Sequence, residues 1–158
     1  MVHLLQLLEI LAKAEIEFVL VGGVAAYAYG SPMVTQDLDI CGDLSTGNVV
    51  RLAKALGPYG PKHRMSPTRP AFTVEQAETE RFNNIYLATD IGQVDFLGQI
   101  KGVGDYDAAF RASEPVSMGD FETRILSLAK LIDAKEAMGR PRDLETASIL
   151  KEIRDETN

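Results

Sequence analysis

Three aspartates stand where their carboxylates could share one metal site. Asp37 and Asp39 are two residues apart, with the apolar Leu38 between them. In a β-strand, side chains two residues apart leave the same face, so both carboxylates point the same way. Neighbouring like charges repel and strands disfavour aspartate, so we expect a divalent cation to offset both costs. The pair therefore predicts a site for a hard cation such as Mg²⁺.

A third carboxylate repeats this pattern later in the chain. Asp95 lies between the apolar residues Val94 and Phe96, as on a strand with one core face and one polar face. If this strand lies beside the strand of Asp37 and Asp39, the three carboxylates form one cluster. Three carboxylates can hold two Mg²⁺ ions, and two-metal sites stabilise the attacking and leaving oxygens of an in-line phosphoryl displacement.

A glycine pair precedes these aspartates. Gly22 and Gly23 follow the apolar run 17–21, which predicts a buried strand that turns through the glycines into a short helix over 24–29. Glycines let the backbone approach a phosphate, and free N–H groups at a helix start bind anions. A plain tight turn is the alternative interpretation of the pair. Together with the carboxylates, the pattern indicates nucleotide chemistry at one edge of a sheet.

The elements that must position these residues are mixed along the whole chain. Further helices are expected at 2–16, 48–56, 106–112, 128–138 and 143–154, and further strands at 37–41, 82–89, 93–98, 115–118 and 121–126. Residues 58–70, rich in Pro, Gly and basic residues, predict the longest loop. The expected class is α/β or α+β: a small mixed sheet with helices packed on it and a helical C-terminal segment. We expect one domain over 1–158, with a core of about 1–100 and a hairpin and helices over about 104–155.

Composition and charge exclude several classes of protein. With 46% hydrophobic and 25% charged residues in 158, the chain is typical of a globular domain and not of a disordered one. One cysteine, Cys41, argues against a disulfide framework and a Cys-rich zinc site. No signal peptide or membrane-spanning run is expected, and the expected location is the reduced cytoplasm. The net charge of −7 weakens a simple nucleic-acid-binding role, although a basic cluster is present at Lys62, His63, Arg64 and Arg69.

The order strand, Gly-Gly, short helix, Asp-x-Asp on a strand and a later lone Asp resembles the polymerase-β-like nucleotidyltransferase superfamily. The resemblance is closest to its small bacterial members, which include minimal nucleotidyltransferases and the nucleotidyltransferase toxins of abortive-infection and toxin–antitoxin systems. It is strongest over 18–40 and continues through Asp95. The tail over 128–144, with Lys135, Arg140 and Asp143, is also similar to a segment of the small members.

This resemblance implies an enzyme that transfers a nucleoside monophosphate from an NTP to a hydroxyl and releases pyrophosphate. Asp37 and Asp39 would ligate Mg²⁺, with two ions expected, and Asp95 would complete the site and deprotonate the acceptor hydroxyl. Gly22 and Gly23 would hold the β- and γ-phosphates. The acceptor would be a protein side chain or an RNA end, and the biological setting a toxin–antitoxin or phage-defence pair. The other nucleotide-binding candidates are Ser31, Thr35 and Lys135.

Two departures from the family pattern leave alternatives open. Many members have Ser at the position of Gly23, and little sequence remains for a separate acceptor-binding domain. The second hypothesis is a catalytically silent module that binds NTP or acts as an antitoxin, and the third is an unrelated α/β domain with surface aspartates. Lys135 either contacts a triphosphate or an acidic residue of the site, or lies on a solvated helix face. Asp143 is expected to cap the last helix and pair with Arg140, and the basic loop is either solvated or an RNA clamp.

Overall fold

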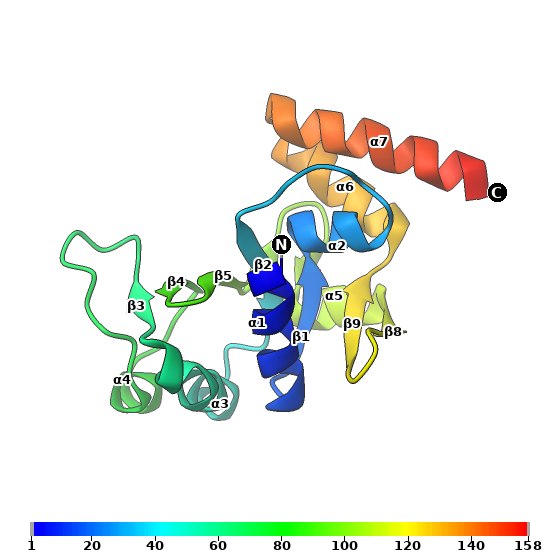
Figure 1. Ribbon diagram of the computed structural model, residues 1–158. Helices are drawn as coiled ribbons and strands as arrows, with labels where there is room; N and C mark the ends of the chain where they lie inside the picture. The colour runs from blue at the N-terminus through cyan, green and yellow to red at the C-terminus, as the bar shows by residue number, and fades with distance from the viewer. Residues whose placement is uncertain (1, 158) are drawn as a thin grey trace.

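A mixed seven-stranded sheet forms the centre of the computed structural model, which describes residues 2–157 (Figure 1). Its strand order is β3-β4-β5-β2-β1-β9-β8. β2 pairs antiparallel with β1 but parallel with β5, and β9 pairs parallel with β1. The strands are β1 (Phe18–Val21), β2 (Asp37–Gly42), β3 (Lys62–His63), β4 (Asn84–Thr89), β5 (Gly92–Leu97), β8 (Ser113–Ser117) and β9 (Glu122–Leu126). A separate pair is formed by β6 (Gln99–Ile100) and β7 (Gly104–Asp105).

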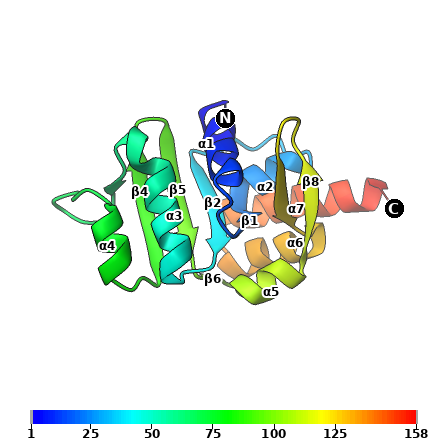
Figure 2. The ribbon, with the colours of Figure 1, turned by 90° about the horizontal axis from the view of Figure 1, so that it is seen from below.

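Helices cover the two faces of this sheet unequally. The helices are α1 (Val2–Lys13), α2 (Gly22–Ala28), α3 (Thr46–Leu56), α4 (Val74–Thr79), α5 (Tyr106–Arg111), α6 (Leu128–Met138) and α7 (Pro141–Thr157), with a 3-10 turn η1 (Gly57–Tyr59). Seen from below, α1 and α3 lie across one face (Figure 2). On the other face, α6 and α7 lie above the half that contains β1 and β9 (Figure 1). No helix of the described residues lies above the half formed by β3, β4 and β5 in this view.

Alternation along β2 and β5 fixes which residues reach the core. Leu38 and Ile40 of β2 and Val94 and Phe96 of β5 are fully buried, on the face that α1 and α3 cover. Burial of each such side chain contributes about 1.5–3 kcal/mol, which holds the strands in this register. The residues between them must therefore point to the other face, where α6 and α7 cover only one half of the sheet.

The mixed α/β architecture expected from the sequence is confirmed, including both predicted hairpins. Some boundaries were wrong. The first helix ends at Lys13 and not at residue 16, because Glu15 adopts a left-handed φ of 58° before the chain enters β1. Gly22 and Gly23 are the first two residues of α2 and not a turn before it. The expected loop 58–70 contains most of η1 and all of β3.

None of the helices within residues 2–157 is long and apolar enough to cross a membrane.

Candidate active site

The parallel pairing of β2 with β5 brings the three predicted aspartates together. Asp39 lies directly opposite Asp95 in the register, and Asp37 is on the same face of β2 as Asp39. One carboxylate oxygen from each residue lies within 4.8 Å of the others. The condition set by the sequence, that the two strands be neighbours, is therefore met. We call these three residues the aspartate triad.

The triad is electrostatically unfavourable without a ligand. Burial raises the pKa of Asp39 to about 7, and the nearby Asp95 and Asp37 add to this rise, while Lys135 opposes it. Burial also raises the pKa of Asp95, against the effect of the neighbouring Arg64. Oδ1 of Asp37 is buried and has no hydrogen-bond partner among the described residues. A buried acceptor without a partner costs about 1–3 kcal/mol, so the triad is a site that a cation would stabilise.

Arg64 approaches the triad from the edge of the sheet. Its guanidinium donates a hydrogen bond to Asp95 and lies over the ring of Tyr86, 5.5 Å from the ring centroid. The backbone N–H of Arg64 donates to the carbonyl of Tyr86 at 3.1 Å, which continues the β3–β4 pairing by one residue. The sequence placed Arg64 in the basic loop and gave it no link to Asp95. Lys62, His63 and Arg64 are three consecutive basic residues without apolar alternation, so the local sequence carried no signal for this short edge strand.

The two glycines allow α2 to begin against the triad. Gly22 has a left-handed φ of +72°, and a Cβ there would lie 2.5 Å from Oδ2 of Asp39. A Cβ on Gly23 would lie 2.6 Å from Cβ of Thr35. Any side chain at either position would push the helix start away from these residues. The glycines therefore bring free backbone N–H groups to the carboxylates and to Thr35.

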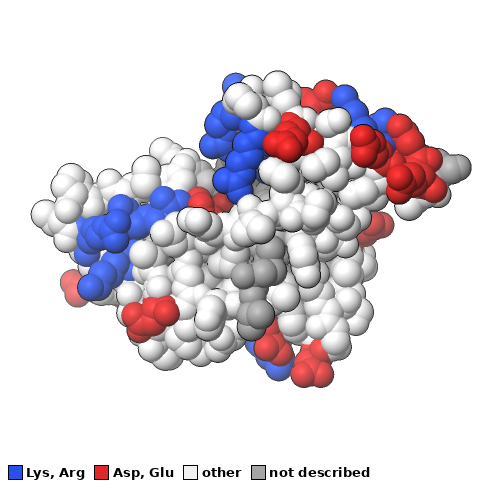
Figure 3. Space-filling view, turned by 45° about the horizontal axis from the view of Figure 1, so that its top comes forward, with Lys and Arg blue, Asp and Glu red and all other residues white. Residues whose placement is uncertain are grey.

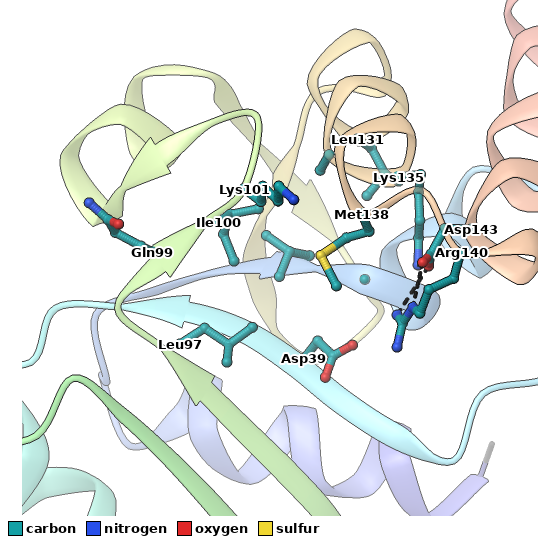
Figure 4. A pocket seen from close by; sticks show the side chains of 13 residues that line it. Asp39, Leu97, Gln99, Ile100, Lys101, Leu131, Lys135, Met138, Arg140 and Asp143 are labelled. Carbon is teal, nitrogen blue, oxygen red and sulfur yellow. Dashed lines mark hydrogen bonds and ion pairs between the residues drawn. The ribbon is translucent and has the colours of Figure 1, made fainter.

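A second group of charges lies above the triad, where α6 meets α7. Asp143 is only 1% exposed and lies in the first turn of α7, so it does not precede the helix as a cap. Its Oδ2 accepts a hydrogen bond from Nε of Arg140 at 2.6 Å, and its Oδ1 lies 3.7 Å from Nζ of Lys135 (Figure 4). The hydrogen bond from Arg140 holds the pKa of Asp143 below its usual range. The pairing with Arg140 was expected. A contact of Lys135 with an acidic residue was one of the alternatives, but Asp143 was not named as that residue.

Two cavities border Asp39 beneath this charged group. One, of about 130 Å³, is mainly apolar and is lined by side chains from β5, β6 and α6, as Figure 4 shows. The other, of about 150 Å³, is lined by Gly23, Thr35, Lys135, Arg140 and Arg142. The apolar lining of the first cavity comes chiefly from Leu97, Ile100, Leu131 and Met138. A flat apolar group and an anionic group would thus find separate places beside the same carboxylate.

Of the predicted nucleotide-binding residues, the structure brings all but one to these cavities. Gly22 lines the first cavity, Gly23 and Thr35 line the second, and Lys135 lines both. The hydroxyl of Thr35 donates to the carbonyl of Asp37 at 3.2 Å. Ser31 is buried and lines neither cavity; its hydroxyl accepts from the N–H of Met33 at 3.3 Å, which is a local turn contact.

No protein-family model matches the chain, and no curated protein sequence is significantly similar to it.

Proposed function

We propose that this protein is a Mg²⁺-dependent nucleotidyltransferase that moves a nucleoside monophosphate from an NTP to a hydroxyl. The supporting observation is the position of the aspartate triad beside the cations of the α6–α7 junction. The triad gathers negative charge, and Lys135 and Arg140 line the same cavities as Asp39 while their ion pairs are made to Asp143. In a metal–triphosphate complex, the positive metal would bind the aspartate triad and the negative phosphates would lie against Lys135 and Arg140.

The triad fits Mg²⁺ in its chemistry. Its donors are carboxylate oxygens, the hard ligands that this ion prefers, and the buried Oδ1 of Asp37 has no other partner among the described residues. Asp37, Asp39 and Asp95 would hold the metal. When bound, Mg²⁺ would neutralise charge on the phosphates and make the attacking hydroxyl more acidic.

The two cavities suggest how the NTP would lie. The triphosphate belongs in the cavity with Gly23, Lys135 and Arg140, because that cavity carries cations and the helix start. The base belongs in the apolar cavity, where Met138 and Ile100 offer surface for a flat ring. Asp39 borders both cavities, so the α-phosphate would lie against the triad.

The chain's own residues supply the proton transfer and charge stabilisation. Asp95 accepts the proton of the acceptor hydroxyl, and its burial favours this role because burial raises its pKa. The hydroxyl oxygen then bonds to the α-phosphorus. The bond between that phosphorus and the bridging oxygen breaks, and pyrophosphate leaves with the electron pair. Lys135 and Arg140 stabilise the charge on the leaving pyrophosphate.

The test is transfer of label from each α-³²P-labelled NTP, with Mg²⁺ and either total RNA or lysate protein as acceptor. We expect one NTP to label one acceptor class with the wild type. Asp39→Asn should lower transfer by more than about 100-fold, because the loss of a supporting residue alone costs about 10–100-fold at metal sites. Asp120→Asn is the control, since Asp120 lies in the exposed turn between β8 and β9. Equal transfer by the two variants contradicts the proposal.

One observation favours a second candidate function, a silent NTP-binding module. Arg64 already neutralises Asp95, the carboxylate that would receive the acceptor proton. Such a module would bind NTP and transfer nothing, as an antitoxin or another partner-binding protein. Mg²⁺-dependent NTP binding without label transfer would support it. The toxin–antitoxin or phage-defence setting remains a prediction from the sequence resemblance.

A further inference from the structure

The half of the sheet formed by β3, β4 and β5 is not covered by α6 and α7 (Figure 1), and we call it the open half. Its register connects the aspartate triad to the basic edge strand β3. Lys62 of β3 pairs with Ala88 of β4, which pairs with Gln93 of β5, which pairs with Asp37 of β2. Paired residues in a sheet point to the same face. The side chain of Lys62 therefore leaves the face that carries the triad, at the outer end of one continuous row.

A second row runs beside the first. Asp39 pairs with Asp95, Asp95 pairs with Tyr86, and the hydrogen bond from the N–H of Arg64 to the Tyr86 carbonyl extends this row to the edge. Strands lie about 4.7–4.9 Å apart, so each row spans about 14 Å from the triad strand to the edge. We call the surface of the outer residues in these two rows the open shelf: Lys62, Arg64, Tyr86, Ala88 and Gln93.

The open shelf has a surface that is basic at its edge and contains no acidic side chain. Between the edge and the triad, the surface of the shelf is formed by Tyr86, Ala88 and Gln93. Tyr86 and Ala88 are half-buried and Gln93 is exposed. The segment 57–74 contains Lys62, Arg64 and Arg69 and no Asp or Glu, in a chain whose net charge is −7. Among the described residues, neither Lys62 nor Arg69 has a salt-bridge partner.

The edge strand is held in place from its other face. Nε2 of His63 lies 2.6 Å from Oε1 of Gln76 on α4, and its ring stacks on Phe82 and meets the edge of Phe72. These contacts fix β3, so the neighbouring cations are presented by an ordered element. Figure 3 shows one group of Lys and Arg at the left of the molecule and another at its upper centre, with acidic atoms visible between the two groups.

We propose that the open shelf binds the single-stranded end of a nucleic acid whose terminal hydroxyl is the acceptor. This inference rests on the proposed function and names its acceptor class. The NTP would take the cavities under α6 and α7, which leaves the shelf as the approach to Asp95 from the opposite side. A strand with its hydroxyl at Asp95 would lay its last phosphodiesters past Arg64, which already donates a hydrogen bond to Asp95, toward Lys62. The repeated phosphates match the segment 57–74, which has cations and no acidic residue. The ring of Tyr86 adds a flat surface of the kind on which bases stack.

The test measures binding of labelled single-stranded oligonucleotides that lack a terminal 3′ hydroxyl, so that no transfer can occur. Fluorescence anisotropy at several salt concentrations is the readout, with RNA and DNA arms of the same sequence. We expect the wild type to bind. The double variant Lys62→Gln/Arg64→Gln should bind at least tenfold more weakly, with a salt slope smaller by about 1.4, since each phosphate contact on a single strand contributes about 0.7. A thermal melt confirms that the variant is folded.

The control has the same change in net charge. Lys13→Gln/Lys151→Gln removes two cations that form ion pairs with Glu9 and Glu136, away from the shelf. It should bind the oligonucleotides as the wild type does. Equal weakening by the two double variants means that only net charge matters, and it overturns the inference. Preference for RNA over DNA supports an RNA end as the acceptor, and equal binding supports any single strand.

The failure of this inference can be told apart from the failure of the proposed function. NTP binding by the wild type is measured separately, as thermal stabilisation by NTP with Mg²⁺. NTP binding without oligonucleotide binding overturns the shelf assignment alone. Label transferred to a protein, with no oligonucleotide bound at low salt, also overturns it and identifies a protein acceptor. Absence of both NTP binding and label transfer overturns the proposed function.

Discussion

Asp39 and Asp143 line the same two cavities, yet their surroundings give the two carboxylates opposite properties. Asp143 is almost completely buried, but Arg140 and Lys135 hold its pKa below the usual range. Burial raises the pKa of Asp39 to about 7, and two neighbouring carboxylates add to this rise. Burial alone therefore does not decide the charge of these groups. The charged partners decide it together with burial, and only Asp143 has cations that outweigh the effect of burial.

The comparison separates a structural carboxylate from one that awaits a ligand. Asp143 joins α6 to α7 and fixes the cations above the cavities. Lys135 offsets the burial of Asp39 and the repulsion from its neighbouring carboxylates only in part, so ionised Asp39 reduces the stability of the ligand-free fold. Sites that violate the rules of stable packing in this way are expected where function requires it. Four predictions test this difference, from the largest expected effect to the smallest.

The first prediction is that Asp39→Asn stabilises the protein without divalent cations. Between about pH 4 and pH 7, native Asp39 keeps a proton that the unfolded chain has released, so the unfolding free energy of the wild type falls as pH rises. Asparagine cannot ionise, and this loss disappears. At pH 7 the variant should be more stable by on the order of a few kcal/mol. Thermal melts in EDTA across this pH range measure the effect. At pH 4 the two proteins should differ little; equal pH slopes contradict the prediction.

The second prediction is the opposite effect at Asp143. Asp143→Asn removes the charge that accepts hydrogen bonds from Arg140, and we expect a loss of about 1.5–3 kcal/mol in unfolding free energy. Urea denaturation at pH 7 measures it. Glu136→Gln is the matched control, because it breaks the exposed Lys151–Glu136 bridge between the same two helices and should cost less than about 1 kcal/mol. Similar losses for the two variants would show that the burial of Asp143 has no special role.

The third prediction concerns the cation that already contacts the triad. Bound Mg²⁺ must compete with the guanidinium of Arg64 for Asp95, so Arg64→Gln should respond to severalfold lower Mg²⁺ concentrations. The measurement is the Mg²⁺ concentration at half-maximal thermal stabilisation. Arg51→Gln, on the exposed face of α3, should match the wild type. An unchanged midpoint for Arg64→Gln would mean that Arg64 and the metal do not compete.

The smallest expected effect is at α4, the helix that contacts the edge strand β3. The hydroxyl of Thr73 caps α4 by accepting from the N–H of Gln76, and α4 holds His63. Thr73→Ala should cost about 1 kcal/mol and speed amide exchange in β3 but not in α6. Thr79→Ala removes a hydroxyl from the other end of the same helix and should cost less. Uniform exchange changes in both regions would show that the two halves of the sheet do not open separately.

The sequence predicted those parts of the site that depend on local periodicity. Asp37 and Asp39 share a face because Leu38 and Ile40 must be buried, and Arg140 reaches Asp143 because they are three positions apart near a helix start. Contacts that depend on how two elements pack against each other were not predictable. The Lys135–Asp143 contact depends on how α6 crosses α7, and the Arg64–Asp95 contact on the docking of a two-residue strand. α4 was missed although Thr73 and Gln76 form a helix-start signal in the sequence.

The parallel pairing of β2 with β5 also bears on how the protein folds. These two strands belong to distant parts of the chain, and α3, β3, α4 and β4 come between them in sequence. Contacts of such long sequence separation form slowly, because a large loop must close first. Metal affinity should therefore be absent from early folding intermediates and from fragments that end before β5. Its appearance during refolding would report the moment when the two halves of the chain join.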